Sequence, residues 1–89
     1  MEATIEFSGM IHMAKTFEGE YPEEIMEQLE RIQDLDCLAR MGPNFGDDTT
    51  ELQDFLNRYH SGELTWDDIR NMNFELSIGT IKCTDLQEG

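Results

Sequence analysis

The chain has 89 residues, which is the length of one domain, and we expect residues 1–89 to fold as a single α+β unit. It carries 20 Asp and Glu residues against 6 Lys and Arg residues, so its formal net charge is −14. This charge excludes a basic footprint for nucleic acid over most of the surface, and it excludes attraction to anionic lipid.

The N-terminal segment alternates apolar and polar residues, which is typical of a strand with one buried face. The apolar residues and one glycine occupy the odd positions Ile5, Phe7, Gly9, Ile11 and Met13. Phe17 keeps this phase, so the strand either continues through Lys15 and Thr16 or bends at Gly9.

A helix is predicted from Pro22 to about Arg40. Proline suits the first helical position, and the acids Glu23 and Glu24 complement the positive end of the helix dipole. Apolar residues then recur at helical spacing, at Ile25, Leu29, Ile32, and Leu35 or Cys37. Gly42-Pro43 is a stop signal, and a break in the helix near residues 34–36 stays open.

Two more helices are predicted after a loop at residues 43–49. The first begins at a capping box in which Thr50 is the cap and Gln53 reaches back, and it ends at Ser61-Gly62. Its apolar face repeats at helical spacing, at Leu52, Phe55, Leu56 and Tyr59. The second helix is short and starts at Thr65, with Asp68 three residues further on completing the cap.

The C-terminal segment is predicted to be one strand with a bulge at Gly79-Thr80, because its alternation slips there. The residues that alternate are Phe74, Leu76 and Ile78, and then Ile81 and Cys83. We therefore expect an α+β fold. A small antiparallel sheet, in which the N-terminal strand or hairpin pairs with the C-terminal strand, packs against two helices and one short helix.

Two strands alone are marginally stable. Either residues 10–19 form a hairpin or a partner supplies another strand, and an unpaired edge leaves open a homodimer.

The sequence contains no recognisable motif for catalysis, metal binding or phosphate binding. The serines lie outside any GxSxG context, and the cysteines and histidines lack the close spacing of zinc sites. The EF-hand pattern is missing, and the glycines at 42 and 46 precede acids rather than a lysine. We expect no catalytic residue, no metal and no cofactor. A small enzyme or metal binder is the less favoured alternative.

No apolar run reaches the ~18 residues that span a bilayer, and residues 1–4 lack a positively charged signal region. We therefore expect a cytoplasmic protein without membrane contact. Cys37 and Cys83 form no CxxC pair and are far apart in sequence. Free thiols in a reducing compartment are expected, with a disulfide as the alternative.

Acidic residues are concentrated between residues 18 and 36, where eight acids occur with one base, Arg31. Those at helical spacing are expected on one helix face, opposite the apolar residues; they are Glu20, Glu23, Glu27, Glu30 and Asp34. Like charges at i, i+4 oppose a helix by a few tenths of a kcal/mol, so partner recognition explains this face better than stability does. Solubility is the alternative explanation.

Further acids follow at the predicted helix starts, where capping is a strong alternative to recognition. The complete set predicted to bind a partner is Glu20, Glu23, Glu24, Glu27, Glu30, Asp34, Asp47, Asp48 and Glu51. Three aromatic residues are candidate anchors beside these charges, although each could equally belong to the core; they are Tyr21, Phe45 and Trp66.

The small size, the charge and the mixed α/β pattern resemble the small acidic inhibitors of phages and mobile elements, which include anti-restriction DNA mimics and many anti-CRISPR proteins. The segment Glu18-Gly19-Glu20-Tyr21-Pro22-Glu23-Glu24 also looks like many small phage proteins. The resemblance implies a non-enzymatic inhibitor in the host cytoplasm. It would occupy the basic groove of a host nucleic-acid-binding defence protein, a CRISPR-Cas effector or a restriction enzyme, and block DNA or RNA by mimicry and steric occlusion.

An alternative is a non-enzymatic interaction module that binds through an apolar surface or a strand edge. An antitoxin, an adaptor or a dimerising phage protein would be of this kind, and its acids would serve only solubility. The salt dependence of partner binding distinguishes the two hypotheses, because screening weakens an electrostatic interface strongly and an apolar interface only a little.

Overall fold

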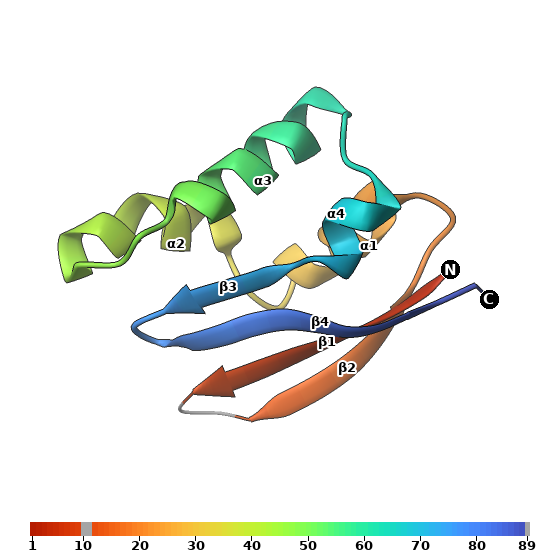
Figure 1. Ribbon diagram of the computed structural model, residues 1–89, viewed down its shortest axis with the longest axis horizontal. Coiled ribbons are helices and arrows are strands. Elements are labelled where there is room, and N and C mark those ends of the chain that lie inside the picture. Colours follow the sequence, from red (N-terminus) through yellow and green to blue (C-terminus); the bar gives the residue numbers. More distant parts are fainter. Residues whose placement is uncertain (10–11, 89) are drawn as a thin grey trace.

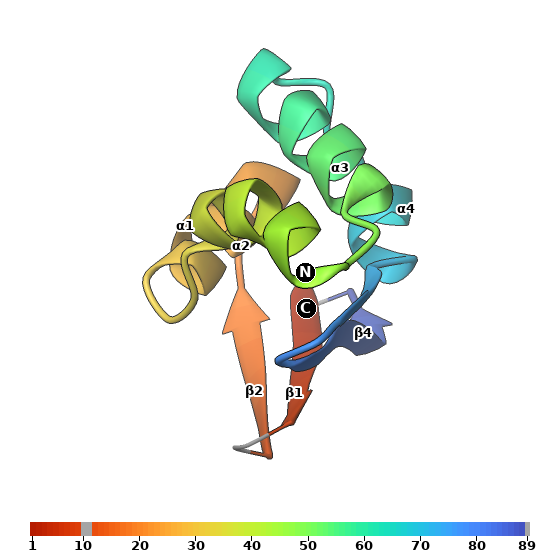
Figure 2. The same ribbon diagram turned by 90° about the vertical axis from the view of Figure 1, so that its left-hand side faces the viewer.

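Within residues 1–9 and 12–88, which are those that the computed structural model describes, four antiparallel strands form one sheet with the order β2-β1-β4-β3. The strands are β1 (Glu2–Gly9), β2 (Met13–Glu18), β3 (Asn73–Leu76) and β4 (Gly79–Gln87). The helices are α1 (Pro22–Glu30), α2 (Leu35–Met41), α3 (Thr50–Ser61) and α4 (Trp66–Arg70), with a 3-10 turn η1 (Gly42–Phe45). The helices cover one face of the sheet (Figures 1 and 2), which confirms the predicted α+β fold.

The N-terminal segment forms a hairpin, one of the two predicted alternatives. β1 pairs with β2 in a register that places Phe7 opposite Met13 and Ala3 opposite Phe17. β1 also pairs with β4, so the two hairpins of this chain together form the four-stranded sheet. Ile11, which was predicted to lie in the strand, is outside the described residues.

The prediction of one C-terminal strand with a bulge at Gly79-Thr80 is wrong. Leu76 pairs with Gly79, so Ser77 and Ile78 form a two-residue turn between β3 and β4. The irregularity lies instead near Thr84, because the β1–β4 register changes from Ile5 opposite Cys83 to Thr4 opposite Asp85. A two-residue turn and a bulge interrupt the alternation in the same way, so sequence periodicity alone does not distinguish them.

The predicted helix from Pro22 to Arg40 is divided into α1 and α2. Asp34 causes the restart, because its carboxylate accepts a hydrogen bond from the backbone N–H of Cys37 at 3.0 Å and so caps α2. The break leaves Ile32 38% exposed, although its spacing from Ile25 and Leu29 placed it on the apolar face.

The two predicted capping boxes have different outcomes. At α4 the box is confirmed, since Thr65 and Asp68 each bond the backbone of the other. At α3 the prediction is wrong, because the N-cap is Thr49, whose side chain caps no backbone N–H; Gln53 Nε2 donates to its hydroxyl oxygen at 3.0 Å instead. Gln53 also donates to the Ala39 carbonyl oxygen at 3.3 Å, so it joins α3 to α2.

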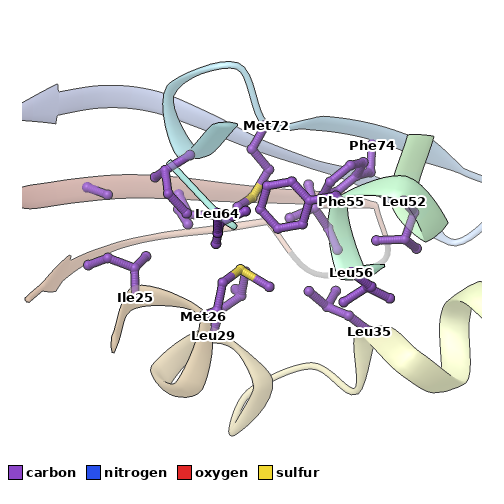
Figure 3. Close-up of a cluster of buried hydrophobic side chains, with 14 of the residues drawn as sticks. Ile25, Met26, Leu29, Leu35, Leu52, Phe55, Leu56, Leu64, Met72 and Phe74 are labelled. Atoms are coloured by element: carbon purple, nitrogen blue, oxygen red, sulfur yellow. The ribbon is translucent and has the colours of Figure 1, made fainter. Parts of the chain in front are cut away.

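The core lies between the helices and the sheet (Figure 3). The Phe55 and Phe74 rings meet edge to face with centroids 5.2 Å apart, which joins α3 to β3. The opposite face of the sheet is polar, and on it the Thr4 and Thr16 hydroxyl oxygens lie 3.0 Å apart. The apolar side chains that the helices contribute to the core are Ile25, Met26, Leu29, Leu35, Ala39, Leu52, Phe55, Leu56 and Ile69.

Candidate functional site

Carboxylates of α1 and α2 lie near Tyr59 of α3, and Asp34 of the loop between the two helices lies near Glu30. We call this group the acidic helix surface; its members are Glu23, Glu27, Glu30, Asp34 and Asp36. Burial raises the pKa of Tyr59, and nearby carboxylates on both α1 and α2 raise it further. The packing of α1, α2 and α3 therefore places carboxylates from separate elements close to one another.

Glu30 is the least favourably placed carboxylate of this surface. Its Oε1 atom is buried and has no hydrogen-bond partner among the described residues. Burial raises the pKa of Glu30, Asp36 raises it further, and His60 partly offsets these effects. Glu30 also ends α1, whose last turn carries no base, so it adds to the negative end of the helix dipole.

Among the described residues, three positive groups lie on or beside the acidic helix surface: His60, Arg31 and Arg40, whose Nε donates to the Asp36 carbonyl oxygen at 3.3 Å. His60 Nε2 lies 3.3 Å from Asp36 Oδ1 and forms an ion pair only when the ring is protonated. Arg31 is exposed at the end of α1. Two other arginines are engaged at α4, where Arg58 lies 3.2 Å from Asp68 and Arg70 lies 3.6 Å from Asp67.

Three of the residues predicted to bind a partner also have structural roles. Asp34 caps α2, and Asp48 accepts a hydrogen bond from the Thr50 N–H at the start of α3. Hydrogen bonds with Thr50 lower the pKa of Asp48. Asp47 holds the β3–β4 turn, accepting bonds from the Ser77 N–H at 2.9 Å and the Ser77 hydroxyl at 3.0 Å. The capping explanation therefore applies to part of the predicted set.

The remaining predicted acids are distributed over different surfaces. Glu23, Glu27 and Glu30 follow i, i+4, i+7 spacing and share one side of α1. Glu24 lies three residues before Glu27, at the border of this side, and Glu20 precedes the helix. Glu51 lies with Arg58 on the side of α3 that faces α4. The predicted single row from Glu20 to Asp34 is thus reduced to its central part on α1 with Asp34 beyond the break.

Sequence reasoning did not assign Asp36 or Tyr59 to a site. In one continuous helix, Asp36 would lie on a different face from Glu23, Glu27 and Glu30. It comes near Glu30 only because the chain breaks between α1 and α2. Tyr59 fits the apolar spacing of α3 and was assigned to its core-facing side. No local signal in the sequence would have brought these two residues together with Glu30.

The three aromatic anchor candidates are in two different environments. Tyr21 and Phe45 are 63% and 67% exposed, so their rings are available to a partner. Trp66 is partly buried and packs against the core, which favours a structural role.

A second feature is an apolar groove of about 290 Å³ at the end of the sheet that carries the two hairpin turns. We call it the turn-end groove. Its side chains come from both hairpins and from the α1–α2 loop, and the principal ones are Phe7, Met13, Ile32, Ile78 and Ile81. Both the acidic helix surface and the turn-end groove include residues next to the break at residues 31–34.

The free edge of β2 is a third candidate surface, in line with the strand-edge reading. Lys15 occupies the middle of this edge strand, on the same face as Ile5, and its Nζ lies 5.7 Å from the Phe17 ring centroid. A charged residue of this kind is a common protection against strand addition. The other edge strand, β3, has only four residues, which also limits strand addition, so the groove is the stronger apolar candidate.

The described part of the chain contains no cluster of three His, Cys, Asp or Glu residues arranged to hold a metal ion. Cys37 and Cys83 are free thiols, and burial raises the pKa of Cys83. None of the described helices is long and apolar enough to cross a bilayer.

Comparison with models of known protein families finds no match, and neither does comparison with curated proteins or with solved structures.

Proposed function

We propose that this protein is a non-enzymatic inhibitor that binds the basic groove of a host nucleic-acid-binding defence protein and excludes DNA or RNA from it. A CRISPR-Cas effector or a restriction enzyme in the cytoplasm of the host cell is the proposed target class. The observation that carries the proposal is the convergence of carboxylates from α1, α2 and their loop in a chain of net charge −14.

The spacing on α1 supports mimicry of a phosphate backbone. Glu23, Glu27 and Glu30 rise along the helix axis by about 5 Å per step, since each residue adds ~1.5 Å. Phosphates of one DNA strand rise by ~3.4 Å per nucleotide along the duplex axis, which is of the same order. Ile25, Met26 and Leu29 are buried beneath them, so the carboxylates stand on a helix that the core holds in place.

The electrostatics of Glu30 support a cationic partner. This carboxylate is partly buried, unpartnered and surrounded by other acids. A lysine or arginine of a partner placed here would relieve the repulsion and lower the pKa of Glu30 again. Opposite charge would also speed association, with on-rates up to ~10⁸–10⁹ M⁻¹s⁻¹ at low salt.

The proposal is tested by capture of proteins from bacterial lysate on the tagged chain at low salt. Elution uses a NaCl gradient and, in a parallel experiment, excess duplex DNA. We expect a nucleic-acid-binding protein to be retained and to be released by either treatment. Retention that is indifferent to both would refute the proposal and indicate an apolar interface.

Charge-reversal variants then test the position of the interface. The helix variant combines Glu23→Lys, Glu27→Lys and Glu30→Lys. The control combines Glu2→Lys, Glu18→Lys and Glu75→Lys on the outer face of the sheet, so both variants change the net charge equally. We expect the helix variant to abolish capture and inhibition while keeping its fold, and the control to keep most of both. The opposite result would move the interface to the sheet.

A further inference from the structure

We propose that the turn-end groove binds an apolar side chain from a lysine- and arginine-rich segment of the partner protein. This inference rests on the proposed function and deepens it, because it gives the charged interface a specific apolar anchor. Charge alone would attract many basic proteins, whereas a groove beside the charges selects segments with an apolar residue in the right place.

The groove is built from three separate parts of the chain. Phe7 and Met13 are paired across β1 and β2, Ile32 comes from the α1–α2 loop, and Ile78 and Ile81 come from the second hairpin. Its volume of about 290 Å³ lies at the lower end of the ~300–1,000 Å³ of ligand pockets. The groove therefore suits one or two side chains rather than a whole helix.

Close backbone packing between the two hairpins keeps this region open. Gly9 and Gly79 are paired across β1 and β4, and both line the groove. A Cβ on Gly79 would collide with the Ser8 carbonyl oxygen, and one on Gly9 would collide with the Ile78 carbonyl oxygen. A side chain on either residue is therefore excluded, and the apolar wall is supplied by their neighbours.

Two isoleucines that line the groove are exposed. Ile78 is 54% exposed in the two-residue turn between β3 and β4. Ile32 is 38% exposed in the α1–α2 break. Exposed apolar side chains that line one shared groove mark an interaction site more strongly than the same residues scattered singly.

Charge decides which occupant fits. Glu30 and Asp34 lie on either side of Ile32 in sequence, and Asp47 is bound to Ser77 next to Ile78. Arg31 is the base among them. A second copy of this chain would bring another net charge of −14 to this end, which opposes self-association. A basic segment has the complementary charge, and its apolar side chain would enter the uncharged groove.

The experiment uses methyl NMR of the full chain labelled at the isoleucine δ1 carbons. The probe is the synthetic peptide Lys-Arg-Leu-Phe-Arg-Lys, and the matched peptide Lys-Arg-Ser-Ser-Arg-Lys has the same charge. We expect the first peptide to shift Ile32, Ile78 and Ile81 and to leave the buried Ile25 and Ile69 unchanged. It should bind at least about tenfold more tightly than the serine peptide, since one or two apolar side chains are buried.

Variants of the chain locate the effect. Ile78→Ser and Ile32→Ser should each weaken binding of the leucine peptide by about fivefold or more. Met41→Ser is the control, because Met41 is 49% exposed at the end of α2 but does not line the groove. The Ile25 and Ile69 methyl signals report whether each variant is folded.

Several results would overturn this inference, and they differ from those that overturn the proposed function. Equal binding of the two peptides would mean that charge acts without the groove, and the proposed function would stand. Binding of neither peptide would also refute the groove. Shifts of Ile32 and Ile78 that depend on protein concentration alone would show a second copy as the occupant. If the leucine peptide binds as expected but DNA releases no captured protein, the proposed function fails and the groove remains.

Discussion

Neutralising Glu30 is expected to stabilise the fold, because this carboxylate is placed where its charge is unfavourable. It ends α1 at the negative end of the helix dipole, its Oε1 atom is buried without a described partner, and Asp36 lies nearby. Glu30→Gln keeps the shape of the side chain and removes the charge. The substitution therefore separates the packing of this residue from its electrostatics.

A minimum size for the effect follows from two of the charge interactions that are removed, those with the helix dipole and with Glu27. An acid at a helix C-terminus is unfavourable by roughly 0.3–1 kcal/mol, and a like charge three or four residues away, here Glu27, adds a few tenths. We expect Glu30→Gln to raise the free energy of unfolding at pH 7 by about 0.5–1.5 kcal/mol. This corresponds to a rise in Tm of about 2–12 °C for a domain of this length.

The pH dependence of stability provides an independent test of whether the Glu30 charge is unfavourable. Because folding raises the pKa of Glu30, the folded state holds its proton more tightly than the unfolded state does. The contribution of Glu30 to stability therefore improves as the pH falls through its raised pKa, and stops changing below the unfolded value. The advantage of Glu30→Gln over the wild type should be largest at neutral pH and should shrink in this acidic window.

Urea denaturation at pH 7 and at pH 4 measures both quantities. Glu51→Gln is the opposite-sign control, because Glu51 lies in the first turn of α3, where an acid stabilises the helix by ~0.3–1 kcal/mol. A loss of stability in Glu30→Gln, or a difference from wild type that is the same at both pH values, would refute the electrostatic account of the acidic helix surface.

Three further predictions concern packing and the backbone, and urea denaturation measures each of them. Gly79→Ala should lower the free energy of unfolding by more than about 2 kcal/mol, because a Cβ at this φ of 139° would collide with the backbone of β1. Gly62→Ala should lower it by only about 1–2 kcal/mol, because Gly62 has a φ of 76° but faces open space. Equal losses would contradict the close packing of the hairpins. Phe55→Ala should lose about 3–5 kcal/mol and the exposed Phe45→Ala less than about 0.5 kcal/mol, and a similar loss in both would contradict the assigned core. Asp47→Ala should lose about 1–2 kcal/mol through its two bonds to the β3–β4 turn, and no loss would leave Asp47 free for a role in recognition alone.

Local patterns determined much of the secondary structure. Period-two alternation indicated β1 and the C-terminal strands, and helical spacing with a stop at Ser61-Gly62 indicated α3. The capping box at Thr65 and Asp68 was correct because both partners lie within one turn of chain. Such signals depend on neighbours in sequence, so they can be read without the fold.

The positions where these patterns are interrupted could be interpreted only with the tertiary structure. Ile32 keeps the helical spacing of Ile25 and Leu29, yet the Asp34 cap interrupts the helix after Glu30. The slip at Gly79 has the same sequence pattern in a turn as in a bulge, and pairing with Leu76 decided for the turn. An Asp at residue 34 fits a cap or a continuous helix, and the slip fits a turn or a bulge, so the structure was needed to choose between the alternatives.

The same division applies to the candidate site. The sequence by itself determined the net charge of −14 and the concentration of acids between residues 18 and 36. Only the tertiary structure brought Asp36 beside Glu30 and Tyr59, and only it gave Asp47 a structural task at the β3–β4 turn. The physical reason is that a carboxylate has the same chemistry whether it caps a helix, holds a turn or faces solvent, and its surroundings decide among these roles.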